Sequence, residues 1–253
     1  MFSNPAATAR PTLCGFLLAA SALVAAHQPL LTDDAGTQGV AGNQIEFSWN
    51  EDQATQAATT TRSRSAPLVY TRGLAETFDA FIQANEGGSG NPSFGFKWRF
   101  YENTESKTSL AVKPEVRLSL NPAGEASSGQ ARTTVGVTAI LSQEVPFGMV
   151  HANLLTNQDR FRDSRQFPEL TRTRASIAPV WDVTDGWKLA LDLAVEIAKT
   201  AATTIRAKIV HSGLVYSLNK DVDFAAGITH RTTNDMPRTT THSGTLGITW
   251  RFK

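Results

Sequence analysis

The chain has 253 residues, with 24 Lys and Arg against 23 Asp and Glu, 41% hydrophobic residues and one cysteine. This length suits one large β-domain or two small domains. Because the charges nearly cancel, there is no electrostatic case for nucleic acid as a partner, and no stretch beyond the N-terminal region approaches the length of an apolar transmembrane helix.

Residues 1–26 have the pattern of a secretory signal peptide. Arg10 is the first charge, an apolar run from Leu13 to Ala26 follows, and the run ends in "LVAA". The only cysteine, Cys14, precedes the apolar core, which disfavours a lipoprotein anchor. Without Arg10 the 24 basic residues fall to 23 and equal the 23 acidic ones. We therefore expect an exported mature chain with a net charge of zero and no cysteine.

Residues 27–42, "HQPLLTDDAGTQGVAG", precede the first strand-like run, and we expect them to lie under the barrel described below or inside it as a plug. Asp33 and Asp34, followed by Gly36 and Gly39, raise the alternative of a calcium loop. The EF-hand spacing and its terminal Glu are absent, so a turn is the favoured interpretation and we expect no metal site.

From residue 43 onward the sequence alternates in short runs rich in aromatic and β-branched residues. In "FGFKWRF" (94–100), for example, aromatic residues alternate with Gly, Lys and Arg, which is the period of a β-strand with one apolar face. Twelve such runs lie near 43–50, 66–72, 76–85, 93–102, 107–120, 131–145, 147–158, 171–183, 187–199, 203–218, 222–231 and 240–252.

One run, "GWKLALDLAVEIAK" (186–199), is ambiguous by itself. Trp187, Leu189 and Leu191 begin an unbroken alternation, but Lys188, Asp192 and Glu196 lie four residues apart and the composition favours a helix. Because it follows the turn "VTDG" and is flanked by strand-like runs, we expect a strand with its apolar row towards lipid.

The connections between the runs alternate between longer and shorter. The longer ones include "EDQATQAATTTRSRS", "EGGSGNP", "NPAGEASSGQ" and "DRFRDSRQFPEL"; the shorter ones are "GLA", "NTES", "PFG", "TDG" and "NKD". This asymmetry is typical of a transmembrane antiparallel β-barrel, and the even number of strands places both termini on the periplasmic side. We therefore predict an all-β protein in which residues 43–253 form a twelve-strand outer-membrane barrel.

A secreted β-sandwich is the alternative fold, because its strands also alternate. The strand lengths, the loop asymmetry and the position of the tryptophans towards strand ends favour the barrel; they are Trp49, Trp98, Trp181, Trp187 and Trp250. Pro114 and Pro179 fall within strands and cannot donate to the ladder, so each is expected at a bulge or at the rim.

The segment 27–49, with its "TDDAGTQG" element, resembles the start of a family of bacterial outer-membrane proteins named for a putative role in the meta-cleavage pathway of phenol degradation. "PLVYTRGLAETFDAFIQ" (67–83) and "PVWDVTDGWKLALDLAVEI" (179–197) are similar to its strand–turn–strand units. The resemblance implies a barrel in the outer membrane of a Gram-negative bacterium, with lipid and the barrel-assembly machinery as partners, and it carries a transporter label. The chain departs from many outer-membrane barrels in ending on Lys253 instead of Phe252.

A lipid-facing hydrolase is the alternative from another functional class. His211–Ser212 and His242–Ser243 are sequence neighbours and so point to opposite faces of a strand, which leaves a cross-strand pair such as His230 with Ser243. Nothing supplies the third, orienting group, so we expect no catalytic residues, no cofactor and no enzyme activity.

The polar row of the strands is expected to line the lumen, either as ion pairs that hold the wall together or as a permeation path. By alternation this row includes Glu46, Asp79, Lys97, Arg99, Lys113, Glu115, Arg117, Arg132, Glu144, Arg174, Lys188, Asp192, Glu196 and Arg251. Mixed signs argue against strong ion selectivity. The expected function is passive passage of small molecules, with aromatic or sparingly soluble compounds as first candidates and a purely structural barrel as the alternative.

The arginine-rich stretch "NQDRFRDSRQFPELTRTR" (157–174) is expected to be an outer loop. Such a loop is usually solvated, but arginines also bind the phosphates of lipopolysaccharide, and the loop could fold inward as a constriction.

Overall fold

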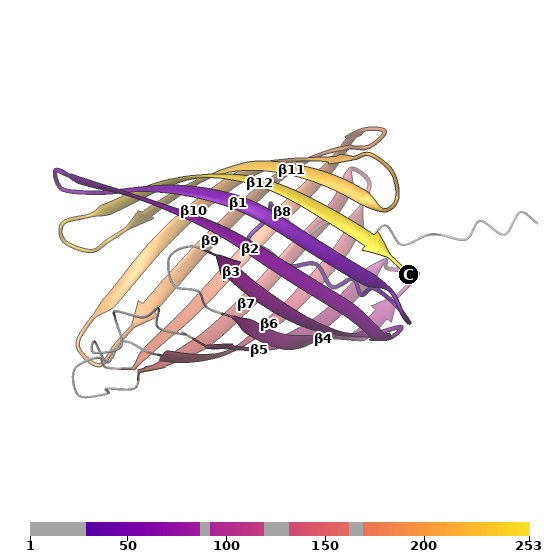
Figure 1. Cartoon of the computed structure of the whole chain (residues 1–253), viewed down its shortest axis with the longest axis horizontal. Coiled ribbons are helices and arrows are strands. Elements are labelled where there is room, and N and C mark those ends of the chain that lie inside the picture. The colour runs from indigo at the N-terminus through magenta and orange to yellow at the C-terminus, as the bar shows by residue number, and fades with distance from the viewer. Residues whose placement is uncertain (1–28, 87–91, 119–131, 162–168) are drawn as a thin grey trace, which may run out of the picture.

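A computed structural model describes residues 29–86, 92–118, 132–161 and 169–253 (Figure 1). Twelve strands are present in these residues: β1 (Asn43–Gln56), β2 (Thr59–Ala75), β3 (Phe78–Glu86), β4 (Ser93–Asn103), β5 (Thr108–Leu118), β6 (Arg132–Val145), β7 (Gly148–Phe161), β8 (Leu170–Thr184), β9 (Trp187–Lys199), β10 (Thr204–Ser217), β11 (Val222–Thr233) and β12 (Thr239–Phe252). The predicted signal peptide, 1–26, lies outside the described residues.

The strands form one closed antiparallel barrel. Each strand pairs with its neighbours along the chain, and Asn43 of β1 lies opposite Phe252 of β12, which closes the ladder. A sandwich consists of two separate sheets with open edges, so closure excludes that alternative and confirms the twelve-strand barrel. No helix long and apolar enough to cross a membrane occurs in the described part of the chain.

The ambiguous run 187–199 is strand β9. It pairs with β8 on one side and β10 on the other, for example Leu193 with Ile177 and with Val210. Leu189 and Leu193 are exposed on the outer surface, whereas Asp192 between them is fully buried. The twofold alternation therefore outweighs the helix-forming composition.

The two ends of the barrel differ. The start of β1, the C-terminus and the short turns, such as 146–147 and 185–186, lie at one end, called the turn end; the opposite end, called the loop end, carries the other connections (Figure 1). The predicted long loop over 51–65 is wrong, because β1 and β2 continue to a two-residue turn at 57–58 and form a projecting hairpin. The predicted loop 157–174 is also shorter than expected: 157–161 and 170–174 belong to β7 and β8, and 162–168 lie outside the described residues.

The two strand prolines are accommodated without a bulge, contrary to the prediction. Around Pro114 the pairing between β4 and β5 is interrupted. It is present at Gly95–Glu115, absent at the next two positions, and present again in the same register at Trp98–Val112. Pairing between β8 and β9 is interrupted in the same way around Pro179. Each proline still has a partner on its other side, so the missing N–H removes ladder bonds locally without shifting the strand.

Aromatic side chains gather on the outside at the turn end. Trp187 packs on Tyr216 with ring centroids 4.7 Å apart, Trp250 on Phe252 at 4.6 Å, and Trp181 on Phe147 at 5.7 Å. Amphipathic rings are enriched where a barrel crosses the membrane–water interface. Trp49 and Trp98 depart from the prediction. β1 extends seven residues beyond Trp49 and β4 extends five residues on each side of Trp98, so both lie in the middle of their strands.

Candidate functional site

Residues 29–42 lie inside the barrel and are called the lumen segment. Their hydrogen bonds reach Asp79 on β3, Ser142 on β6 and Asp192 on β9. These strands are not neighbours in the ladder. One short segment can reach all of them only across the interior, so the side chains that it contacts face the lumen.

The lumen segment enters at the turn end, where it is bonded to β2 and β3. The Gly73 N–H donates to the Gly42 carbonyl at 2.8 Å, and the Ala41 N–H donates to the Gly73 carbonyl at 3.1 Å. A Cβ on Gly73 would lie 1.7 Å from the Gly39 carbonyl oxygen, so this contact requires glycine. Beyond it, both carboxylate oxygens of the buried Asp79 accept the Gln38 N–H, each at 3.1 Å.

In its middle the segment forms ion pairs with two lysines. The Lys113 ammonium lies 2.9 Å from Asp33 Oδ2 and 4.9 Å from the centroid of the Phe81 ring. The Lys97 ammonium lies 3.9 Å from Asp34 Oδ1. Asp34 also accepts the Gly36 N–H at 2.6 Å, the hydrogen bond of a local turn.

The far end of the segment is bound by β8 and β9. Asp192 Oδ2 accepts the N–H groups of Leu31 at 2.9 Å and Thr32 at 2.8 Å. The Thr32 hydroxyl donates to Ser176 Oγ at 2.7 Å, and Arg174 donates to the Leu31 carbonyl at 3.2 Å. One carboxylate thus satisfies two consecutive backbone donors that have left water.

Apolar packing contributes little to the segment's binding. Ala35 forms a small buried cluster with Ala111 and Ile140. Its own N–H donates to Ser142 Oγ at 2.8 Å. The segment is therefore held mainly by hydrogen bonds and ion pairs, which can exchange with water at modest net cost.

Further ion pairs lie along the inner wall away from the lumen segment. They are Arg251–Asp223 at 2.6 Å, Arg117–Glu115 at 2.7 Å, Arg231–Glu196 at 3.0 Å and Arg172–Asp159 at 3.5 Å. Each pair joins opposite charges, so the wall carries both signs without a large region of either.

The structure places the residues predicted for the polar row in three groups. Contacts with the lumen segment are made by Asp79, Lys97, Lys113, Arg174 and Asp192. Wall pairs involve Glu115, Arg117, Glu196 and Arg251. The remaining residues, apart from Glu46 and Arg132, lie near the turn end: Arg99 pairs with Glu102, Lys188 with Asp182 and Glu144 with Lys107.

Glu46, Arg132 and Arg206 belong to none of these three groups. Glu46 is buried, and its Oε1 has no hydrogen-bond partner among the described residues. Arg132 begins β6, but its side chain lies outside the described part. Arg206 is exposed on the outer face of β10, because Ala207 and Ile209 are the buried residues of the opposite, inner face.

Several interior residues were missed from sequence. Asp223 and Arg231 share one face of β11, so alternation could have found them. Arg172 and Asp159 fall in the stretch 157–174, which the sequence predicts as an outer loop. Ser142 and Ser176 carry no charge, and only the position of the lumen segment reveals their role.

The serine–histidine pair considered from sequence does not form. Thr229 lies opposite Ser243 and His230 opposite His242, which places Ser243 inside and His230 outside. Ser212 shares the outer face with His230, yet no hydrogen bond joins these two described side chains. In the same part of the chain no group of three or more His, Cys, Asp or Glu could hold a metal ion.

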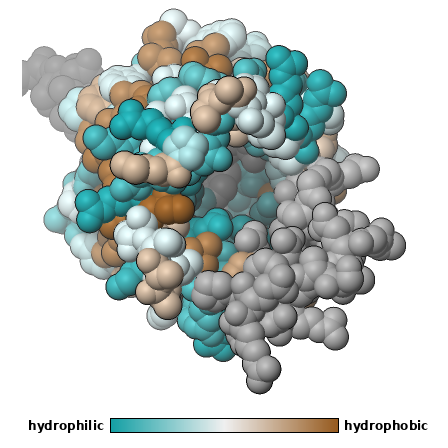
Figure 2. Space-filling view, turned by 90° about the vertical axis from the view of Figure 1, so that its left-hand side faces the viewer, coloured by the Kyte–Doolittle hydropathy of each residue, from teal (hydrophilic) through white to brown (hydrophobic). Residues whose placement is uncertain are grey.

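The barrel is hollowed at its loop end. Figure 2 looks into this end and shows an opening bordered largely by hydrophilic side chains. The arrangement combines a polar mouth, a wall of paired charges and a segment across the interior that is bound mainly through polar contacts. Such a site can admit a solute and restrict its passage.

Comparisons with known proteins show likeness in the fold. No protein-family model and no curated protein matches the sequence. An outer-membrane channel from Pseudomonas putida F1 is similar with a TM-score of 0.61 at 11% identity, over 87% of this chain and 98% of that one. The NanC porin (TM-score 0.52, 9% identity, 81% and 98% covered) and the KdgM porin (0.51, 11%, 81% and 99%) are also similar. At these identities the likeness concerns the fold alone.

Proposed function

We propose that this barrel is a channel for the passive passage of small molecules across the outer membrane of a Gram-negative bacterium, with the lumen segment as its constriction. The observation that carries the proposal is the polar attachment of a non-strand segment across a closed barrel. The interior is lined by hydrogen-bonding and charged groups, and a segment held by such contacts can exchange them for contacts with water or a polar solute at modest net cost.

The Pseudomonas putida channel and the KdgM and NanC porins, which have a similar fold, support the same function. The resemblance to the phenol-degradation family makes aromatic or sparingly soluble compounds the first candidate solutes. Paired charges of both signs in the wall imply weak selection between anions and cations.

Single-channel conductance of the refolded mature chain tests the proposal. We compare it with a variant lacking residues 29–38, which keeps the Gly39–Gly73 contact at the turn end. The deletion should raise the conductance, because it removes the segment without touching the ladder. Altered migration on a gel before and after boiling verifies that both barrels are closed.

The outcomes separate the alternatives. Ion conductance that rises on deletion supports a channel restricted by the segment. A full-length barrel that conducts no ions but lets apolar solutes enter liposomes would support a plugged transporter. Two folded barrels with neither conductance nor uptake would contradict the proposal in favour of a structural role.

A further inference from the structure

The outer surface of β10, β11, β12 and β1 changes from apolar to polar over three successive rows of paired residues. The lowest row, nearest the turn end, is apolar: Leu214, Ala226, Leu246 and Trp49. The middle row is Ser212, Ile228, Gly244 and Glu51. The upper row is Val210, His230, His242 and Gln53, with Arg62 of β2 beside Gln53. These rows lie on the outside, where a barrel meets lipid and then the interface.

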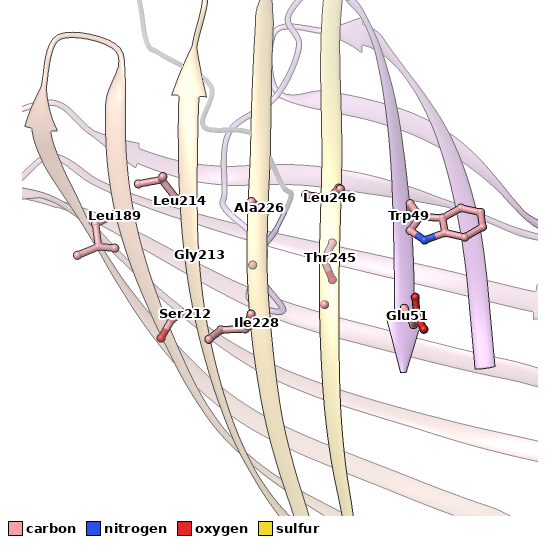
Figure 3. Close-up of a pocket in the computed structure, with 12 residues that line it drawn as sticks. Trp49, Glu51, Leu189, Ser212, Gly213, Leu214, Ala226, Ile228, Thr245 and Leu246 are labelled. Carbon is pink, nitrogen blue, oxygen red and sulfur yellow. The ribbon is translucent and has the colours of Figure 1, made fainter. Parts of the chain in front are cut away.

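A groove crosses these rows because small residues occupy its floor. Ala226 and Gly244 leave an apolar hollow of about 610 Å³ between Leu189, Leu246 and Trp49 (Figure 3). A second hollow of about 640 Å³ continues it towards the loop end between Arg62, His230 and His242. The two share Glu51, Ser212, Ile228 and Gly244, so they form one groove with an apolar part and a polar part.

The polar part favours an anion. The rings of His230 and His242 lie 4.7 Å apart, and Arg62 lines the same hollow. Glu51 is the one carboxylate among the lining residues, and it pairs with Arg64 at 3.6 Å. Lys208 and Arg206 add exposed outward cations on the neighbouring strand β10. Arginine and imidazole N–H groups bind phosphate oxygens by charge-assisted hydrogen bonds.

We propose that this groove binds the lipid A part of lipopolysaccharide, with a phosphate at Arg62, His230 and His242 and an acyl chain in the apolar part. The match is between one amphiphilic groove and one phosphorylated, acylated lipid. The proposal rests on the proposed function in one respect, because it needs the loop end to face the outer leaflet.

Substitutions at Gly244 test the acyl-chain half. A Cβ on Gly244 would meet no atom within 4 Å, so Gly244→Leu fills the groove without strain in the barrel. Ala139→Leu, which places the same leucine side chain on the outer face of β6, is the matched control. Native mass spectrometry of the detergent-solubilised proteins, each titrated with lipid A, should show about tenfold weaker binding to Gly244→Leu only.

The phosphate half is tested by the triple variant Arg62→Gln, His230→Gln and His242→Gln, with Arg160→Gln on β7 as control. Lipid A binding should weaken about tenfold in the triple variant alone, and dephosphorylated lipid A should bind wild type as weakly as the triple variant. If lipid A bound Gly244→Leu as tightly as Ala139→Leu, the groove would not be its binding site. If phosphatidylglycerol bound wild type as tightly as lipid A does, lipid A would not be the specific ligand. Conductance and solute uptake are measured on the same wild-type sample. A wild-type protein that binds lipid A but shows neither conductance nor uptake would contradict the proposed function and leave this site standing.

Discussion

At the scale of single residues, Asp192 joins the wall to the lumen segment. It is fully buried and accepts two backbone N–H groups, from Leu31 and Thr32. Hydrogen bonds to a charged acceptor contribute about 1.5–3 kcal/mol each in net terms, and a buried donor left without a partner costs a similar amount. Asp192→Ala should therefore release this end of the segment into water.

Thiol labelling measures that release. The chain's own cysteine, Cys14, lies in the predicted signal peptide, so a single cysteine at Leu31 in the mature chain reports alone. Labelling should be markedly faster in Asp192→Ala than in the parent. Asp223→Ala, which removes a wall carboxylate paired with Arg251, is the control and should leave the rate unchanged. Equal rates in the two variants would mean that Asp192 does not hold the segment.

The sequence could predict much of the environment of such residues, but not their partners. Alternation places Asp192 on the polar row of its strand because Leu191 and Leu193 flank it. It cannot reveal that Thr32, 160 positions earlier, supplies the donor, because the lumen segment has no periodicity to read. Ser142 and Ser176 were missed for the same reason. Their hydroxyls bind the lumen segment only because of the path that the segment takes, and the sequence does not reveal this path.

At the scale of elements, strand identity was predictable because one face of each strand must be apolar within the membrane. The hairpin extension of β1 and β2 was not, since beyond the apolar rows both faces meet water and alternation disappears. Residues 51–65 are polar apart from three alanines, yet their threonines favour extended backbone, and pairing with β12 and with each other keeps them in the ladder. Polarity alone does not distinguish a loop from a strand outside the bilayer.

Strand β9 gives a prediction at this scale. Leu193 is exposed on the outer face, so Leu193→Lys should cost about 2–4 kcal/mol where it lies near the bilayer midplane. Asp192→Lys puts the same charge on the inner face, so it should disturb the lumen segment but let the barrel assemble. Assembly in membranes, read as heat-modifiable migration for lysines at successive positions of 187–197, should alternate with period two. Severity that repeats every three to four residues would contradict the strand.

At the scale of the whole molecule, the barrel and its contents are two systems with different kinds of stability. The ladder is closed by β1 and β12, which leaves no edge from which strands can peel away. The lumen segment depends on polar contacts spread over β2 to β9 and has one small apolar cluster. This difference predicts that the segment can shift while the wall stays intact.

A disulfide between the two systems tests that independence. The hydroxyls of Thr32 and Ser176 lie 2.7 Å apart, so cysteines at both positions place their sulfurs close to bonding distance. If the segment must move for solutes to pass, the oxidised double variant should conduct less than wild type, and a reducing agent should restore the conductance. Each single cysteine variant should ignore the reductant. A double variant whose disulfide is verified by mass, but whose conductance is the same before and after reduction, would place the conducting path beside a stationary segment.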